Sequence, residues 1–379
     1  MKKQKVNMLG EALEGIKTAW RHRRGYEIPA AILDTLDALY PLDKPRPLPI
    51  RKGIKRTETG WHMIFTLRPG TNFSTLKSQQ EYFEDACRLP VTLERKGGYA
   101  HFHIYESKLG NCYPFEWHHS QYPKMDLPLP IGISQQGLEV LDLAKAPHLL
   151  VAGETGYGKS TLLLNIIHSL LPIVKIAIID PKRLQYSYLK KYTALAKKEE
   201  EWQQLLEALD REMERRLDLL DGAEVDKIQK YKGNLNFIVL IIDEVAEITD
   251  KKSIYHIDRL VRLARATGIS VVAATQRPSK KLKVFEENVR DMFIARVCYL
   301  MPDEISSRLV LGDSCNLAAN IPAIPGRGIY KHGINYKTIQ TMSLDLDDAK
   351  KLLKKQCREV EGLATNWCPI KQEQRLLPR

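Results

Sequence analysis

The order of apolar and polar residues divides the chain into two kinds of segment. Over residues 60–105 apolar and polar residues alternate, most regularly in residues 61–67. A period of two is typical of strands that bury one face. A helix-like stretch over residues 76–89 interrupts the alternation, and we therefore expect a small α+β domain over residues 51–125.

Beyond residue 126 the pattern changes to short apolar runs, each followed by polar residues. The runs occupy residues 147–152, 174–179, 236–242 and 268–275. Such runs are typical of parallel strands that helices cover on both faces, and a long charged helix is expected over residues 192–221. We therefore expect an α/β domain over residues 126–343, with ligands at the carboxyl edge of its sheet.

The two ends of the chain are basic. The first 25 residues hold seven Lys or Arg and two Glu, and a helix-like segment follows over residues 29–40. We interpret residues 1–50 as an arm and helix that either contacts phosphates or anionic lipid or is simply solvated. Residues 344–379 form a basic tail with a helix-like start, and the sequence leaves open whether it is a mobile extension or a docking helix.

The first long apolar run ends in a glycine-rich turn with the P-loop pattern G-x-x-x-x-G-K-[ST]. The backbone N–H groups of such a turn curl round the β- and γ-phosphates, and the helix that follows adds its positive end. Lys159 supplies a charge for the phosphate oxygens, and Ser160 supplies a hydroxyl for Mg²⁺. ATP and Mg²⁺ are the expected cofactors, with nucleotide contacts from Gly153, Glu154, Thr155, Gly156, Tyr157, Gly158, Lys159, Ser160 and Thr161.

Two later apolar runs end in carboxylates. Asp243 and Glu244 follow the run over residues 236–242. We expect Asp243 to complete the magnesium shell opposite Ser160 and Glu244 to orient and deprotonate the attacking water. Asp180 and Lys182 follow the earlier run, and they either lie near the nucleotide or pair with each other.

The last apolar run ends at Gln276. A glutamine in this position can hydrogen-bond the γ-phosphate or the attacking water, and can report hydrolysis to the loop that follows. That loop contains Lys280, Lys281 and Lys283. The three lysines either contact a DNA backbone or belong to a solvated loop.

Composition narrows the compartment and the kind of partner. The chain has 58 Lys and Arg against 46 Asp and Glu, a formal net charge of +12. This excess suits nucleic acid or an acidic membrane surface, although a basic protein without such a partner has the same composition. The six cysteines show no metal-binding spacing, and no stretch has the length of a membrane span. We expect a cytoplasmic protein whose membrane association, if any, goes through a partner.

Six motifs resemble those of the FtsK/SpoIIIE family of DNA translocases, in the same order. They are residues 147–156, 179–182, 212–216, 242–244, 265–269 and 274–278. The resemblance extends over residues 126–340 and includes Gly326-Arg-Gly328. It implies a RecA-like motor that forms a hexameric ring and uses ATP to pump double-stranded DNA through its centre.

The resemblance also implies roles for single residues. Lys159 and Ser160 look like the phosphate and magnesium ligands, and Asp243 and Glu244 like the Walker B pair. Gln276 then resembles the sensor, and Arg265 resembles the arginine finger that completes the neighbouring subunit's site.

The chain departs from the large chromosomal members of the family, because it shows neither their N-terminal membrane helices nor their C-terminal winged helix. It is therefore more similar to the short FtsK-like proteins of conjugative elements, plasmids and prophages. We expect a translocase that moves the DNA of such an element. The alternative is a coupling or adaptor ATPase that recruits a relaxase or replication initiator, with its DNA, to a transfer or replication apparatus.

Overall fold

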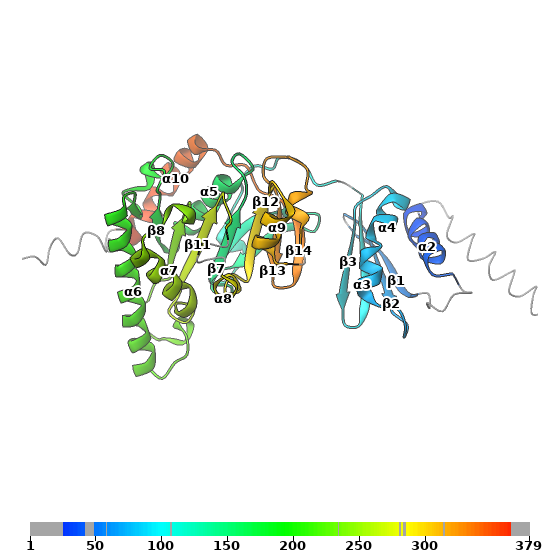
Figure 1. Ribbon diagram of the computed structural model, residues 1–379, viewed down its shortest axis with the longest axis horizontal. Helices are drawn as coiled ribbons and strands as arrows, with labels where there is room; N and C mark the ends of the chain where they lie inside the picture. Colours follow the sequence, from blue (N-terminus) through cyan, green and yellow to red (C-terminus); the bar gives the residue numbers. More distant parts are fainter. Residues whose placement is uncertain are drawn as a thin grey trace, which may run out of the picture. The chain divides into compact units, whose positions relative to one another are not determined.

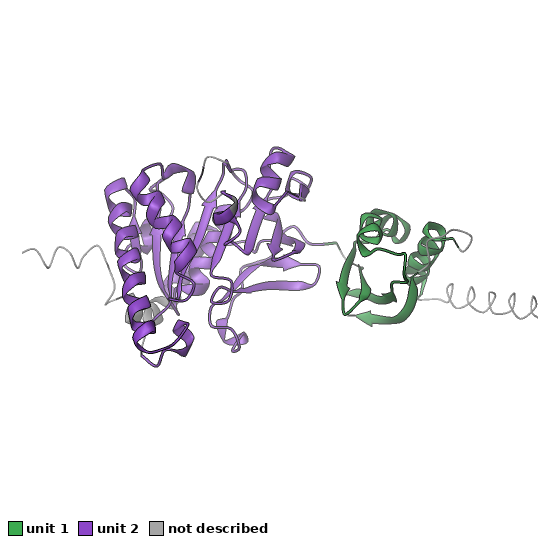
Figure 2. Cartoon of the chain, turned by 60° about the horizontal axis from the view of Figure 1, so that its bottom comes forward, with its two compact units in different colours: residues 1–108 green, residues 109–379 purple. Residues whose placement is uncertain are grey.

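The computed structural model describes residues 26–41, 49–57, 59–106, 108–233, 235–279, 282, 286–313 and 315–364. The chain divides into two compact units, Met1–Lys108 and Leu109–Arg379 (Figures 1 and 2). Each unit has a hydrophobic core of its own. The basic arm expected before residue 26 lies outside the described residues.

The sequence placed the domain boundary after residue 125, whereas the structure divides the chain after Lys108. Backbone hydrogen bonds explain the difference. The N–H of Ser343 donates to the carbonyl of Tyr113 (2.6 Å), and the N–H of Phe115 donates to the carbonyl of Ser343 (3.1 Å). The segment after residue 108 is therefore fixed to the C-terminal unit.

The N-terminal unit is a four-stranded antiparallel sheet with helices on one face. The strand order is β1-β2-β4-β3, and the strands are β1 (Ile50–Thr57), β2 (Gly60–Thr66), β3 (Val91–Lys96) and β4 (Tyr99–Tyr105). The helices are α2 (Glu27–Leu39), α3 (Phe73–Ser78) and α4 (Gln80–Cys87). Alternate strand residues such as Met63, Phe65 and Phe102 enter the core with Leu36, as the period of two predicts.

The expected helix over residues 76–89 is two helices instead. The carboxamide oxygen of Asn72 caps α3 by accepting from the N–H of Ser74 (3.0 Å), so the helical segment begins before Leu76. It breaks at Gln79, whose backbone conformation differs from that of a helix, and α4 ends at Arg88 in the left-handed region (φ 55°).

The C-terminal unit contains a ten-stranded sheet in the part that the structure describes. Its order is β6-β5-β14-β13-β12-β7-β11-β10-β8-β9. The strands are β5 (Pro128–Ser134), β6 (Gly137–Asp142), β7 (His148–Ala152), β8 (Lys175–Ile179), β9 (Ala194–Ala196), β10 (Ile238–Ile242), β11 (Ile269–Thr275), β12 (Ala295–Tyr299), β13 (Arg327–His332) and β14 (Asn335–Gln340). In this order, the six strands from β12 to the edge strand β9 pair in parallel with their neighbours. The pairs from β6 to β12 are antiparallel.

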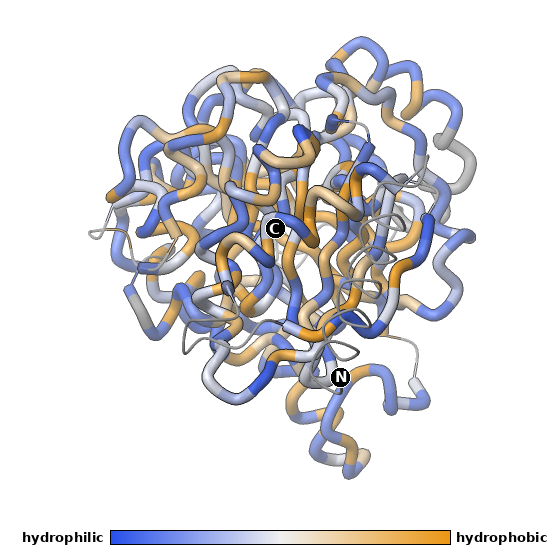
Figure 3. The backbone as a smooth tube through the Cα atoms, turned by 90° about the vertical axis from the view of Figure 1, so that its right-hand side faces the viewer, coloured by the Kyte–Doolittle hydropathy of each residue, from blue (hydrophilic) through white to orange (hydrophobic). Residues whose placement is uncertain are grey.

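Helices cover both faces of this sheet, which gives three layers (Figure 1). Helices α6 (Glu199–Gly222) and α7 (Lys251–Leu263) pack on one face, together with the short helices α8 (Glu287–Arg290) and α9 (Glu304–Leu311). Helices α5 (Lys159–Leu170) and α10 (Leu346–Ala364) pack on the other. The central strands consist largely of hydrophobic residues, as Figure 3 shows by colour, and their side chains are buried in the cores on both faces of the sheet. The α/β fold class expected from the sequence is confirmed.

Two segments differ in detail from the expectation. The charged helix starts at Glu199 because residues 194–196 pair with β8 as an edge strand, and because the Glu201 carboxylate accepts from the N–H of Lys197 (2.7 Å). At the other end of the chain, Ala349 and Leu353 of α10 are buried with the residues of α5. The start of the basic tail therefore packs on the C-terminal unit. Among the described residues, no helix combines the length and apolar character needed to cross a membrane.

Candidate functional site

Four neighbouring parallel strands bring the predicted site residues to one edge of the sheet. Strands β7, β11, β10 and β8 lie side by side, and all four run in the same direction. The P-loop follows β7, Gln276 follows β11, Asp243 and Glu244 follow β10, and Asp180 follows β8. Segments that are far apart in the sequence therefore meet at the carboxyl edge, where α/β sheets bind ligands.

The P-loop forms the turn expected between β7 and α5. Gly158 precedes the helix with φ +114°, a conformation that side chains disfavour. Lys159 opens α5 and is 3% exposed, whereas Thr155 and Gly156 are exposed. Burial lowers the pKa of the Lys159 ammonium, although the adjacent Glu244 opposes this effect. An amine kept in this position needs an anionic partner.

Glu244 is that partner, and it is 4% exposed. One of its oxygens lies 3.3 Å from Lys159 Nζ and 3.6 Å from Lys182 Nζ. The other accepts from the hydroxyl of Thr275 (2.6 Å) and the N–H of Gln276 (3.0 Å). The sequence left open whether Lys182 lies near the nucleotide or pairs with Asp180. Its contact with Glu244 agrees with the first interpretation.

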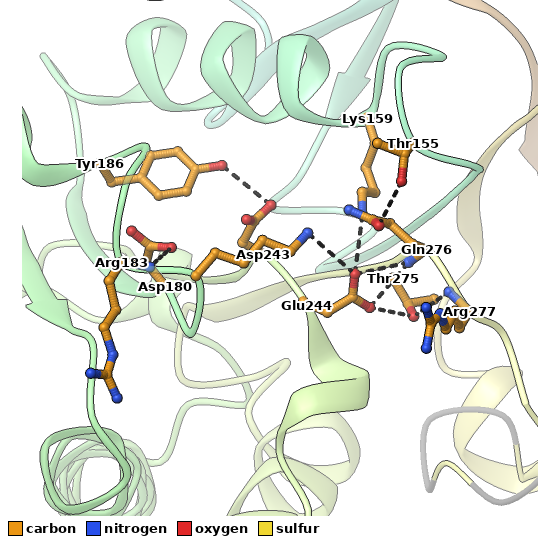
Figure 4. Close-up of polar contacts among 11 residues, drawn as sticks. Thr155, Lys159, Asp180, Arg183, Tyr186, Asp243, Glu244, Thr275, Gln276 and Arg277 are labelled. Atoms are coloured by element: carbon orange, nitrogen blue, oxygen red, sulfur yellow. Dashed lines mark hydrogen bonds and ion pairs between the residues drawn. The ribbon is translucent and has the colours of Figure 1, made fainter.

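The Gln276 amide joins the P-loop to this cluster (Figure 4). Its oxygen must face the two ammonium groups, because the opposite orientation would point amide hydrogens at them. In this orientation the oxygen accepts from Lys159 Nζ (3.2 Å) and from Lys182 Nζ, and the nitrogen donates to the Thr155 hydroxyl (2.8 Å). A glutamine that touches the P-loop and the basic residues is placed to detect what occupies the loop.

Asp243 and Asp180 are the most deeply buried acids of the site, at 1% and 0% exposed. Asp243 accepts from the phenol of Tyr186 (3.4 Å), and burial raises the pKa of its carboxyl. Asp180 accepts from the N–H of Arg183 (2.9 Å), while its second oxygen has no hydrogen-bond partner. Two buried carboxylates with few donors fit a nearby divalent cation, which would stabilise their charged forms.

The residues present therefore fit Mg²⁺ in the manner usual for nucleotide sites. Within the described residues no three His, Cys, Asp or Glu side chains converge as a metal cluster. Mg²⁺ normally binds NTPases through one or two protein oxygens, substrate phosphates and water. Ser160 at the start of α5 and Asp243 would hold it here.

A cleft of about 590 Å³ lies over the P-loop, a size suited to a small-molecule ligand. Its lining includes Glu154, Thr155, Gly156, Gly158, Lys159, Ser160, Thr161 and Gln276. It also includes Gly326, which belongs to the Gly326-Arg-Gly328 motif, and residues that the sequence did not indicate, namely Asn111, Cys112, Ala323, Ile324, Pro325, Gln340, Thr341 and Ser343. These come from the segment after residue 108 and from the β13–β14 region, and no local pattern predicts that they meet the P-loop.

Arg265 lies away from this cleft. It is exposed on the turn between α7 and β11, at the amino end of β11. Gln276 follows the carboxyl end of the same strand, and seven residues of strand span roughly 20 Å. Arg265 therefore faces away from the site of its own chain. The predicted DNA contacts Lys280, Lys281 and Lys283 lie outside the described residues.

Comparison with known proteins identifies the sequence relationship. Residues 113–237 match the model of the FtsK/SpoIIIE family. The DNA translocase FtsK of Campylobacter jejuni (strain 81-176) is 33% identical over 209 residues, which are 50% of this chain and 21% of that protein. The DNA translocase FtsK of Borreliella burgdorferi is 36% identical over 211 residues, 50% of this chain and 27% of that protein. The chain thus spans about a quarter of the length of these relatives.

Solved structures show the same fold. The conjugation coupling protein TcpA of pCW3, in a monomer form with ATPγS, matches with a TM-score of 0.60 at 23% identity, over 87% of this chain and 99% of that one. ATPases 2 and 3 of EssC from Geobacillus thermodenitrificans match with a TM-score of 0.54 at 18% identity, over 72% and 53%. The P-loop NTPase fold and the FtsK/SpoIIIE resemblance inferred from the motifs are both confirmed.

Proposed function

We propose that this chain is an ATP-driven DNA translocase with an FtsK/SpoIIIE-type motor, which acts as a hexameric ring on the DNA of a mobile element or plasmid. The observation that supports it best is that Lys159, Glu244 and Gln276, which follow three different strands, contact one another at the P-loop, where Lys159 and Gln276 line the cleft. A phosphate-binding amine, a carboxylate base and a sensor amide are the groups that ATP hydrolysis requires.

The ion pair between Lys159 and Glu244 suggests how binding prepares the site for hydrolysis. In the structure the ammonium lies 3.3 Å from the Glu244 carboxylate. When the β- and γ-phosphates enter, they compete for the ammonium and remove one cation from Oε2 of Glu244. The Thr275 hydroxyl and the Gln276 N–H still hold the carboxylate in place, so Oε2 is positioned to accept a proton from water. Mg²⁺ held by Ser160 and Asp243 would neutralise the phosphate charge.

The position of Arg265 supports catalysis between protomers. An exposed guanidinium at the amino edge of the sheet cannot reach the cleft at the carboxyl edge of the same chain. In a ring each protomer would offer Arg265 to the cleft of its neighbour. An arginine that acts in trans makes hydrolysis depend on assembly.

The net charge of +12 supports a polyanionic partner. We place DNA at the loop that carries Lys280, Lys281 and Lys283, because this loop directly follows the sensor Gln276. Affinity for duplex DNA should then fall with salt, and replacing the three lysines by glutamine should lower the log–log slope by about 0.9 for each phosphate that a lysine no longer neutralises. An unchanged slope would move the DNA-binding surface elsewhere.

The second candidate is a conjugative coupling ATPase that recruits a relaxase–DNA complex without translocating DNA itself. It is favoured by one observation, namely that the fold matches TcpA over nearly the whole of that chain. The two candidates share nucleotide binding and differ in motion along DNA.

The test is ATP turnover of the full chain with single-stranded DNA, duplex DNA and no DNA, followed by displacement of a protein block from duplex DNA. A translocase hydrolyses ATP faster with its DNA and removes the block. Glu244→Gln is the control, because it keeps the shape of the side chain and should bind ATP without turnover. Stimulated hydrolysis without displacement supports the coupling protein, and no hydrolysis under any condition contradicts both candidates.

A further inference from the structure

The segment that enters the C-terminal unit lines the same cleft as the P-loop. This entry segment, residues 109–113, begins with the buried Leu109 and continues with the exposed residues Asn111 and Cys112. Both Asn111 and Cys112 line the cleft. The proposed function uses the P-loop side of the cleft and leaves this wall without a role.

Arg327 fixes the entry segment in place. Its side chain is buried, and its Nη2 donates to the carbonyls of Leu109 (3.2 Å) and Gly110 (2.9 Å) and to Oδ1 of Asn111 (3.1 Å). Its Nε donates to Oε1 of Gln340 (3.0 Å). One guanidinium therefore holds three consecutive residues that lie more than 200 positions away in the sequence.

The residue before Arg327 contacts the P-loop. The N–H of Gly326 donates to the carbonyl of Tyr157 (2.9 Å). A Cβ on Gly158 would lie 2.8 Å from the Cα of Gly326, so this close approach of the two backbones requires glycine at position 158. Adjacent residues of β13 and the turn before it thus bind the P-loop on one side and the entry segment on the other.

We infer that the entry segment is the base-side wall of the nucleotide pocket, and that Arg327 is the positioning residue that holds it there. This inference rests on the proposed function. The P-loop accounts for the phosphates, so the ribose and the purine base of a nucleoside triphosphate lie along the remaining lining, which includes Asn111 and Cys112. Because Arg327 occupies Oδ1 of Asn111, its Nδ2 is the atom that donates to a ring nitrogen of the base.

The alkylation rate of the Cys112 thiol reports whether a ligand covers this wall. It is exposed, whereas Cys298 and Cys315 are buried and Cys87 is half-buried in the N-terminal unit. The experiment measures the rate of iodoacetamide alkylation at each cysteine by peptide mass spectrometry, using the full chain. The ligands are Mg²⁺ with ATPγS and Mg²⁺ with tripolyphosphate, which has the phosphates but no base. Calorimetry measures the binding of each ligand separately.

Saturating ATPγS should slow alkylation of Cys112 by about tenfold or more, while tripolyphosphate changes it less than about twofold and Cys87 reacts equally in all samples. Arg327→Gln should weaken ATPγS by about five- to tenfold, the loss expected when charge-assisted hydrogen bonds no longer order a wall. It should leave tripolyphosphate affinity unchanged, and Arg327→Lys should recover part of the loss. Arg308→Gln is the matched control, because Arg308 is an exposed arginine of α9 away from the cleft.

Each other result has a distinct meaning. If calorimetry shows that ATPγS binds and Cys112 still reacts at the same rate, the wall assignment is wrong and the proposed function stands. Equal protection by tripolyphosphate would also overturn it, because the base would then be unnecessary. If ATPγS does not bind at all, the proposed function fails with it. Should Arg327→Gln not fold, Cys112→Trp tests the same wall, since added bulk must weaken ATPγS and spare tripolyphosphate.

Discussion

The two units keep their charged residues in different places. In the C-terminal unit Lys159, Asp180, Asp243 and Glu244 are all less than 5% exposed and gather behind the ends of parallel strands. In the N-terminal unit the charged residues lie at the surface. The edge strand β1, for example, carries the exposed residues Arg51, Lys52, Lys55 and Arg56. Burying a charge costs free energy unless a partner compensates it, whereas an exposed charge costs little. The buried charges at the carboxyl edge of the C-terminal sheet therefore need partners close by, whereas the exposed charges of β1 do not.

The largest expected effect is the loss of ATP turnover when Arg265, which lies outside the buried cluster, is replaced. Arg265→Ala should lower ATP turnover of the assembled protein by about 10³- to 10⁵-fold, because the guanidinium stabilises charge in the transition state of the neighbouring protomer. ATP binding should persist. The measurement is DNA-stimulated phosphate release, with Arg262→Ala as the matched control, since Arg262 is exposed on the same segment and pairs with Asp258 at 2.8 Å.

Mixing separates action in trans from damage within the chain. A Glu244→Gln protomer keeps its own Arg265, so it can complete the cleft of an Arg265→Ala neighbour that keeps Glu244. Mixed assemblies should recover part of the turnover that both pure variants lack. If mixtures stay inactive, Arg265 acts within its own chain or only in folding.

Nucleotide affinity should be the next largest effect. Lys159→Ala should weaken ATP binding by about 10²- to 10³-fold, because the ammonium is the charge that meets the phosphates inside the cleft. Lys182→Ala is the matched control. Its amine also contacts Glu244, but its side chain is 41% exposed, and we expect a loss of less than about tenfold. Equal losses for the two lysines would remove the distinction between buried and exposed charge at this site.

The residues that the sequence predicted as the site of the C-terminal unit follow strand ends. Asp243, Glu244 and Gln276 come directly after apolar runs, Lys159 follows the P-loop turn after β7, and the parallel sheet places those ends together. Four parallel strands of the sheet, β7, β8, β10 and β11, followed from the same runs. Local order along the chain was therefore enough to collect these residues in one place.

Contacts between distant segments could not be predicted in this way. The wall formed by Asn111 and Cys112 depends on Arg327, and nothing in the sequence near either segment indicates the pairing. The same holds for β9, whose three residues become a strand because β8 offers an unpaired edge. In the N-terminal unit the alternating pattern predicted strands, but the exposed charged residues did not indicate a functional site.

The free energy of unfolding should change by a smaller amount when the buried pair of Lys159 and Glu244 is broken. Lys159→Ala leaves Glu244 buried with one fewer cation, and removing one partner of a buried pair typically costs about 3 kcal/mol or more. Lys182 and the N–H of Gln276 still contact Glu244, so we expect the lower end of this range. Adding Glu244→Gln to Lys159→Ala should restore most of the loss in urea unfolding. If the double variant is less stable than the single one, charge compensation does not explain the burial.

The smallest effect compares one histidine from each unit. In the C-terminal unit Nδ1 of His148 accepts from the N–H of Val271 (3.1 Å), and burial lowers its pKa from 6.5 to about 3. In the N-terminal unit His103 stacks on His62 with ring centroids 4.4 Å apart, and burial lowers its pKa from 6.5 to about 4, with Glu94 and Lys96 nearby. Both folded pKa values are depressed, so the unfolded chain binds more protons below pH 6.5 and stability falls with falling pH.

Calorimetric melting between pH 7 and pH 4 measures this loss for each unit. Carboxylates also titrate in the lower part of this range, so the comparison is between variants and the parent chain. His148→Gln should flatten the pH dependence of the C-terminal transition, and His103→Gln should flatten that of the N-terminal transition by less, because His103 is partly exposed and its pKa is shifted less. Neither transition should respond to the histidine of the other unit. If His103→Gln gave the larger change, the N-terminal sheet would constrain a titrating side chain at least as strongly as the core of the C-terminal unit does, and the contrast between the units would fail.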